Sequence, residues 1–170
     1  MIYFTSDWHL GDQSFIDREI RPFKDVDVME QTILDGINIE VKKDDVLYVL
    51  GDVSIGDDNK RLKNFLSQLN VKRKSLIIGN HDTLSLSEYI DAGFESIHSS
   101  LILEKYCRFE LTLIHDPAVA GCFLEHRFIC GHVHRLFQSI GNTINVSCCV
   151  WNYAPISITK VNDIFTQNEI

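Results

Sequence analysis

Three short apolar runs in the first half of the chain each end abruptly in small or polar residues. The runs cover 2–6, 46–50 and 76–78. Uninterrupted apolar runs of this length are typical of strands buried on both faces. Between them, apolar residues recur three or four positions apart from 29 to 41 and from 62 to 69, with Asp57 and Asp58 as candidate caps of the second helix. This alternation predicts a β-α-β-α-β start to the chain and a parallel sheet.

Strand-like runs dominate the second half, after a short helix predicted at 85–92 and closed by Gly93. The predicted strands of this half cover 97–103, 107–114, 128–130, 143–149 and 156–159. No linker, low-complexity tract or repeat divides the two halves, so we predict a single domain over residues 1–170. The pattern favours the α/β class, with two sheets packed together and flanked by helices.

The composition fits an ordinary globular domain rather than a disordered or fibrous chain. Of the 170 residues, 45% are hydrophobic and 24% are charged, and the formal net charge is −8. The acidic balance argues against a broad basic face for extended nucleic-acid binding. The five cysteines contain no CxxC pair, no leader precedes the first strand, and no apolar stretch has membrane-spanning length. We therefore expect a reduced, cytoplasmic protein with no membrane partner.

Residues that can bind metal recur directly after the predicted strand ends, where an open α/β sheet presents its ligand-binding crevice. These residues are Asp7, His9, Asp52, Asn80, His81, His115, His132 and His134. In Asp7-x-His9 and His132-x-His134 we expect both side chains on the same side of an extended segment, because alternate residues share a face. Each piece alone has a common structural explanation as a turn cap or a core histidine. Their joint placement at successive strand ends favours one functional site.

The order of these motifs resembles that of the calcineurin-like metallophosphoesterases. Asp-x-His, Gly-Asp, Gly-Asn-His-Asp, a lone histidine and Gly-His-x-His follow one another from Asp7 to His134. The resemblance implies a four-layer α/β/β/α sandwich of two mixed sheets flanked by helices, with two divalent metal ions in the site. It also implies the ligands, which are Asp7, His9 and His134 for the first ion, Asn80, His115 and His132 for the second, and Asp52 as the bridge between them.

The implied ligands suit a hydrolytic metal centre. Imidazole, carboxylate and amide oxygen favour Mn²⁺ as the first choice, with Fe, Zn²⁺ or Ni²⁺ as alternatives, over Ca²⁺. A bridging carboxylate can hold two ions about 3.5–4 Å apart, close enough to share a water and turn it into a hydroxide nucleophile at neutral pH. The resemblance leaves His81 outside both ligand sets. We therefore predict that His81 is the catalytic residue that donates a proton to the departing oxygen or stabilises its charge.

A small phosphate ester is the expected substrate. Two divalent cations outweigh the two implied carboxylates, so the site would attract phosphate although the chain is acidic. We predict that Asn80 also contacts the substrate and that Arg21 binds its phosphate through a bidentate fork, the alternative being a surface arginine in a turn. Asp82 either orients His81 or caps the following turn.

The resemblance is to the small prokaryotic and phage-type phosphoesterases rather than to protein phosphatases, whose arginines after Gly-Asp and after Asn-His are absent here. We therefore expect hydrolysis of phosphodiester or phosphomonoester bonds in small, nucleotide-like substrates. One alternative is a nuclease on short or single-stranded nucleic acid, and the other is a non-catalytic metal-binding scaffold for protein interaction. The nuclease draws on a basic cluster formed by Lys60, Arg61, Lys63, Lys72, Arg73 and Lys74. The sequence leaves the oligomeric state open.

Overall fold

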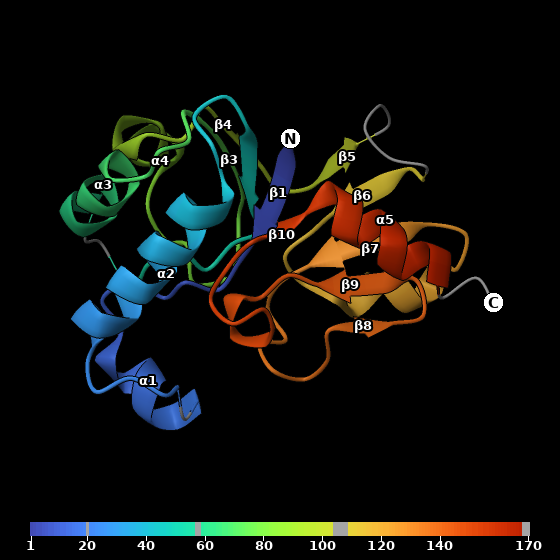
Figure 1. Ribbon diagram of the computed structural model, residues 1–170, viewed down its shortest axis with the longest axis horizontal. Helices are drawn as coiled ribbons and strands as arrows, with labels where there is room; N and C mark the ends of the chain where they lie inside the picture. The colour runs from blue at the N-terminus through green and yellow to red at the C-terminus, as the bar shows by residue number, and fades with distance from the viewer. Residues whose placement is uncertain (20, 57–58, 104–108, 168–170) are drawn as a thin grey trace.

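Two five-stranded sheets form the centre of the computed structural model, which describes residues 1–19, 21–56, 59–103 and 109–167 (Figure 1). The first sheet is built from β1 (Ile2–Thr5), β2 (Val46–Val49), β3 (Arg73–Ile77), β4 (Ser96–His98) and β10 (Ile156–Ser157). Its strand order is β10-β1-β2-β3-β4. Strands β1 to β4 run parallel, and β10 pairs antiparallel with β1. The predicted parallel start of the sheet is therefore confirmed.

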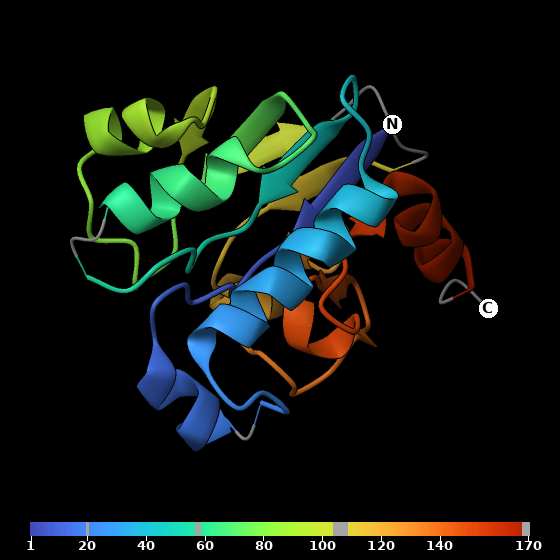
Figure 2. The same cartoon turned by 60° about the vertical axis from the view of Figure 1, so that its left-hand side comes forward.

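Three helices cover one face of the first sheet (Figure 2). They are α2 (Val26–Glu40), α3 (Asn59–Ser67) and α4 (Leu86–Ala92). Along β2, Leu47 and Val49 belong to the core cluster shared with these helices, while Tyr48 packs against the cluster on the opposite face. Burial on both faces explains why the strands read as uninterrupted apolar runs.

Local capping sets the ends of these helices where the sequence predicts them. The side chain of Asp25 accepts the Val28 N–H at the start of α2. At the start of α4, Ser85 and Glu88 form a capping box, in which each side chain accepts the backbone N–H of the other residue. Gly93 ends α4 with φ of 126°, a backbone conformation that favours glycine.

The second sheet packs on the other face of the first. It is built from β5 (Leu101–Leu103), β6 (Leu111–Leu113), β7 (Arg127–Cys130), β8 (Ser139–Ile140) and β9 (Thr143–Asn145). In the order β5-β6-β7-β9-β8, the three central strands run parallel and the two outer strands run antiparallel. Leu113, Ile129 and Ile144 share one core cluster with Phe4 and Ile77 of the first sheet.

Two further helices come from the second half of the chain. The 3-10 helix η1 (Pro117–Cys122) contacts β7, and the helix α5 (Ile158–Gln167) contacts β1 and β10. The sequence does not predict α5, because Ile-Ser-Ile-Thr at 156–159 has the composition of a strand. Only the first two of these residues pair with β1. From Ile158 onward the buried residues Val161 and Phe165 keep helical spacing and join the core between the sheets.

Two other predicted strands are interrupted. The run 97–103 breaks between β4 and β5, and its two pieces lie in different sheets. The run 143–149 ends with β9, because the Asn145 side chain accepts the Ser147 N–H at 2.9 Å and the chain turns into the 3-10 helix η2 (Cys148–Val150). The pattern of apolar residues cannot predict these breaks, because they depend on the path of a loop in one case and on a side-chain hydrogen bond in the other.

The predicted α/β class with two mixed sheets flanked by helices is confirmed. Among the described residues, no helix is long and apolar enough to cross a membrane. The candidate caps Asp57 and Asp58 and the first residues of the predicted strand at 107–114 lie outside the described residues. The single-domain organisation over residues 1–170 stays a prediction.

Candidate metal centre

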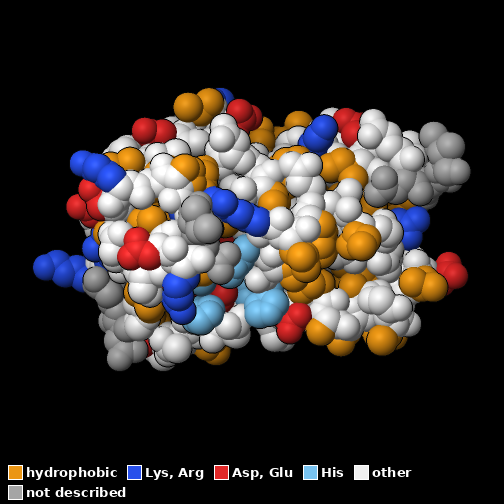
Figure 3. Space-filling view, turned by 90° about the horizontal axis from the view of Figure 1, so that it is seen from below, with side chains coloured by type: hydrophobic (Ala, Val, Ile, Leu, Met, Phe, Trp, Pro, Cys, Tyr) orange, Lys and Arg blue, Asp and Glu red, His pale blue; other side chains and the backbone are white. Residues whose placement is uncertain are grey.

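The topology brings the carboxyl ends of five strands to one edge of the two sheets, and the metal-binding motifs follow these ends. Asp7 and His9 follow β1, Asp52 follows β2, Asn80 follows β3, His115 follows β6, and His132 and His134 follow β7. Figure 3 shows histidine side chains gathered in a hollow on this face, with acidic atoms visible between them. Segments far apart in the sequence therefore contribute to one site.

The ligand atoms form two groups that share one carboxylate. The first group contains Asp7, His9, Asp52 and His134, and the second contains Asp52, His115 and His132. Within each group the ligand atoms lie within 4.8 Å of one another. The structure thus brings together every Asp and His that the sequence assigns to metal, with Asp52 between the two groups.

Five of the seven predicted ligands have a left-handed backbone. Their φ values are 58° at Asp7, 51° at His9, 55° at Asp52, 68° at His132 and 45° at His134. The segments 7–9 and 132–134 are therefore not extended. The prediction that their side chains share one side because the backbone is extended is wrong. Such backbone costs of order 1–3 kcal/mol per residue and persists only where surrounding contacts impose it. Here the Asp7 and His9 N–H groups donate to the carbonyls of Gly51 and Asp52, each at 3.0 Å.

Close approach of two loops requires glycine at Gly51 and Gly79. Gly51 has φ of 83°, and a Cβ atom there would lie 2.6 Å from the Gly79 Cα. A Cβ atom on Gly79 would lie 2.6 Å from the Asp52 backbone nitrogen. Neither loop can move away without moving Asp52, so the two glycines let the loops after β2 and β3 meet at the shared ligand.

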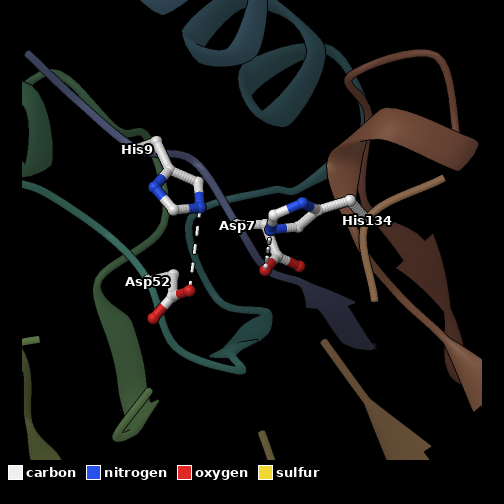
Figure 4. Close-up of side chains that lie close together, drawn as sticks. All are labelled: Asp7, His9, Asp52 and His134. Atoms are coloured by element: carbon white, nitrogen blue, oxygen red, sulfur yellow. Dashed lines mark ion pairs between the residues drawn. The ribbon is translucent and has the colours of Figure 1, made fainter. Parts of the chain in front are cut away.

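The four side chains of the first group lie close together (Figure 4); Asp7, His9 and Asp52 are buried, and His134 is partly exposed. His9 Nε2 lies 3.7 Å from Asp52 Oδ2, and His134 Nε2 lies 3.5 Å from an oxygen of Asp7. Among the described residues, His9 Nε2 and Asp52 Oδ2 are buried atoms without a hydrogen-bond partner. Buried polar atoms left in this way are costly unless a ligand satisfies them, so these donors fit a divalent cation of intermediate hardness.

Electrostatics keep His9 and Asp52 in the forms that bind metal. Burial is the largest effect on His9 and lowers its pKa to about 2, so the imidazole is neutral at pH 7. Burial alone would raise the pKa of Asp52, but the His115 ring, the His81 backbone N–H and the His9 ring outweigh it and lower that pKa to about 2. Asp52 is therefore ionised at pH 7, and its charged carboxylate belongs to both groups.

The second group includes the side-chain amide of Asn80. Its Oδ1 lies 2.8 Å from His132 Nδ1 and 3.0 Å from His115 Nε2, and His115 Nε2 lies 3.3 Å from Asp52 Oδ2. His115 Nδ1 donates to the Leu50 carbonyl at 2.7 Å, which fixes the ring orientation as in many metal-bound histidines. Burial alone would lower the pKa of His115, but Asp52 and the Leu50 carbonyl raise it to about 9.

Asp82 has neither of the roles that the sequence suggests. Its carboxylate accepts the N–H groups of Gly79 at 2.8 Å, Asp52 at 2.9 Å and Val53 at 2.9 Å. It therefore ties the loop after β3 to the loop after β2 instead of orienting the His81 ring or capping the next turn. Burial raises the pKa of the Asp82 carboxyl, and repulsion from the Asp52 carboxylate raises it further. The three N–H groups lower this pKa but do not outweigh the rise.

His81 is exposed at the mouth of the site and belongs to neither ligand group. Its ring centroid lies 5.4 Å from that of His9, and its backbone N–H donates to Asp52 Oδ1 at 2.9 Å. The side chain therefore stands beside the ligands without being one of them. Its catalytic role stays a prediction.

Arg21 requires a correction, because its position does not suit a contact with substrate phosphate. The side chain is only 3% exposed. Its guanidinium donates to the carbonyls of Asp7 at 2.6 Å and Trp8 at 3.1 Å, beneath the first ligand group. Arg21 is thus neither the predicted phosphate fork nor the surface arginine of the alternative. It holds the backbone of the Asp7–His9 segment.

The basic cluster does not form a continuous basic face. Arg61 is paired with Asp27 at 2.9 Å and with Glu30 at 2.8 Å. Lys74 is buried, and its ammonium donates to the Val71 carbonyl at 3.0 Å. The sequence support for a nuclease is correspondingly weaker, since these two cations are not presented to a nucleic acid.

Two supporting residues escape sequence reasoning. Phe15, in α1 (Gln13–Glu19), is buried and stacks on the His9 ring. Asn145 is fully buried, and its side-chain amide donates to the carbonyls of His134 at 2.8 Å and Phe137 at 2.7 Å. Asn145 carries a signal, because a polar residue stands within an apolar strand-like run. Phe15 carries none, because an apolar residue in a short helix is ordinary.

A comparison with protein families identifies the family of the chain. The model of the calcineurin-like phosphoesterases matches residues 1–147, which include all seven predicted ligands and His81. The chain belongs to the calcineurin-like phosphoesterase family. Members are phosphoester hydrolases that bind divalent metal ions, and the two side-chain groups described here are where this chain could hold them.

Individual relatives match this chain over different shares of its length. An uncharacterized protein of Methanocaldococcus jannaschii, MJ1445, is 28% identical over 176 residues, which are 99% of this chain and 93% of that protein. The gene 66 protein of Mycobacterium phage L5 is 36% identical over 83 residues, 47% of this chain and 39% of its own length. The crystal structure of AQ665, a protein of unknown function from Aquifex aeolicus, aligns with a TM-score of 0.77 and 26% identity, covering 96% of this chain and 98% of AQ665.

Proposed function

We propose that this chain is a dinuclear metal-dependent phosphoesterase that hydrolyses phosphodiester or phosphomonoester bonds of small, nucleotide-like substrates. The observation that carries the proposal is a pair of ligand groups that share Asp52, with buried atoms of His9 and Asp52 left without hydrogen-bond partners. A structural cluster would satisfy these atoms internally. A cluster that awaits cations does not.

Two ions are assigned to the two ligand groups, with Mn²⁺ as the first choice and Fe, Zn²⁺ or Ni²⁺ as alternatives. The first is assigned to Asp7, His9 and His134, the second to Asn80, His115 and His132, and Asp52 to both. When bound, such ions supply Lewis-acid charge toward phosphate and lower the pKa of a water molecule. The chain's own contribution is to fix the ligand orientations through the left-handed loops and the bonds of Asp82.

His81 is the proposed catalytic residue. The exposed ring is close to the ligand groups without joining either, so it can approach the ester oxygen that leaves. It would donate a proton to that oxygen or stabilise its charge. Asn80, which is also exposed, would contact the phosphate beside it.

The proposed partner is a small phosphate ester rather than a macromolecule. A non-catalytic scaffold would not need His81 next to a complete ligand set. Free thiols at the described cysteines fit the reducing cytoplasm as the place of action; these cysteines are Cys122, Cys130, Cys148 and Cys149.

The proposal is tested by hydrolysis of 4-nitrophenyl phosphate and bis(4-nitrophenyl) phosphate, with Mn²⁺ and after chelation. We expect activity that requires the metal and that is lost in Asp52→Asn. A wild-type protein inactive with every metal and both esters, or full activity in Asp52→Asn, would contradict the proposal. A panel of cyclic nucleotides, mononucleotides, sugar phosphates and short oligonucleotides then assigns the substrate class, and preference for oligonucleotides would favour the nuclease alternative.

A further inference from the structure

One aromatic side chain contacts histidine ligands from both ends of the chain. The centroid of the Phe15 ring lies 3.7 Å from that of His9, and the two rings are inclined by only 15°. The same ring meets His134 edge-on, with centroids 4.9 Å apart and an interplanar angle of 86°. Phe15 is 5% exposed, so these contacts are made in the protein interior.

The position of Phe15 is set by the start of α1. The Asp12 side chain accepts the Phe15 N–H at 2.9 Å, and Asp12 itself is buried. On the other side, the guanidinium carbon of Arg21 lies 4.4 Å from the centroid of the Phe15 ring. The Phe15 backbone is therefore held by Asp12, and its ring packs against Arg21. The N–H groups of Arg21 in turn bind the Asp7 and Trp8 carbonyls.

His9 has no hydrogen bond to orient its ring, in contrast to His115. Metal-binding histidines ordinarily donate their second ring N–H to an oxygen, as His115 does to the Leu50 carbonyl. In the described part of the chain, neither ring nitrogen of His9 makes such a bond, and its Nε2 lies 3.7 Å from Asp52 Oδ2. Of the ring contacts that His9 makes in the described part of the chain, the stacking on Phe15 is the shortest, with centroids 3.7 Å apart against 5.4 Å to His81 and to His134.

We propose that Phe15 is a positioning residue that holds the imidazoles of His9 and His134 in the orientation that the first metal ion requires. The inference rests on the proposed metal-binding function and deepens it. Ring stacking here replaces the hydrogen bond that orients His115 in the second group. An aliphatic residue of similar size fills the same space but leaves the His9 ring free to rotate, and such losses of ligand orientation typically weaken metal binding about 10–100-fold.

The test is metal binding by full-length protein after chelation, compared between the parent protein, Phe15→Leu and Phe15→Tyr. Calorimetric titration with Mn²⁺ gives the affinity, and the visible spectrum of the Co²⁺-loaded protein reports the ligand geometry. In a His132→Ala background, the second group is disabled and the titration reports the first group alone. We expect Phe15→Leu to weaken binding about 10–100-fold and to change the Co²⁺ spectrum. Phe15→Tyr, which keeps an aromatic ring, should have the Mn²⁺ affinity and the Co²⁺ spectrum of the parent protein.

A matched control removes a buried aromatic ring elsewhere. Phe94 is 2% exposed and packs edge-on against Tyr89, and in the described part of the chain its ring does not contact His9 or His134. Phe94→Leu should leave the affinity and the spectrum unchanged. If thermal unfolding shows that Phe15→Leu is not folded, Phe15→Met takes its place.

Three results would overturn the role of Phe15. These are unchanged binding and spectrum in the aliphatic variant, failure of Phe15→Tyr to restore them, and an equal loss in Phe94→Leu. Absence of metal binding in the parent protein is a different result, because it would refute the proposed function itself.

Discussion

The carboxylate of Asp82 accepts the backbone N–H of Asp52 at 2.9 Å, so one acidic residue supports the backbone of another that lies at the centre of both ligand groups. The same carboxylate binds the N–H groups of Gly79 and Val53. Because Asp52 has φ of 55°, these bonds help to impose an unfavourable backbone on the shared ligand.

Asp82→Asn should therefore damage the site without removing a ligand. An asparagine presents an N–H group to donors that need an acceptor, so we expect the free energy of unfolding to fall by about 1–3 kcal/mol. Metal content should fall with it. Thermal and urea unfolding, with metal analysis, measure both effects. The control is Asp91→Asn, an exposed change on α4, which should alter neither. Unchanged stability and metal content in Asp82→Asn would refute the supporting role.

Asp52→Asn should lower the occupancy of both metal positions at once. The amide keeps the shape of the side chain but loses the charge that faces His9 in one group and His115 in the other. Metal analysis after gel filtration checks the prediction. Two tightly held ions in this variant would show that Asp52 does not bridge the groups.

His81→Ala should separate chemistry from metal binding. If His81 protonates the departing oxygen, its loss should slow hydrolysis of an alkyl phosphate ester by about 10²–10⁴-fold. The loss should be smaller for a nitrophenyl ester, whose leaving group does not need the proton. Metal content should match the wild type, because His81 belongs to neither ligand group. Equal losses with both esters would count against a proton donor.

Arg21→Met should reduce stability rather than substrate affinity. It leaves the buried carbonyls of Asp7 and Trp8 without donors, which should cost about 1–3 kcal/mol of unfolding free energy. KM for remaining activity should change little. Arg18→Met, an exposed change on α1, is the control and should be neutral. A large rise in KM at unchanged stability would restore Arg21 as a substrate contact.

Gly79→Ala should disrupt the meeting of the two loops. The added Cβ would lie 2.6 Å from the Asp52 nitrogen, so we expect a loss of about 1–3 kcal/mol in stability, on the scale of overpacking in a core. Gly121→Ala is matched to it, because a Cβ at Gly121 meets nothing within 4 Å. Differential scanning calorimetry of the two variants tests the contrast. Similar melting temperatures would show that the loops can separate.

The gathering of Asp and His side chains in one place could be predicted from the sequence because two independent patterns agree. Apolar runs locate the ends of β1, β2 and β3, and ordered polar motifs follow each end. The left-handed backbone at His9 and the depth of Arg21 could not be predicted, since both depend on hydrogen bonds between distant loops. Phe15 has the same limitation. Its ring meets His134 only after the whole chain has folded.

The unfavourable φ values at the ligands have a consequence for variation of this chain. At positions such as His9 and His134, glycine would adopt the same backbone at less cost, so loss of a ligand can relieve tension in the fold. Laboratory evolution that rewards heat resistance alone would thus drift toward inert proteins. Substitutions that raise thermal stability and keep activity have to lie away from the loops that carry these left-handed residues.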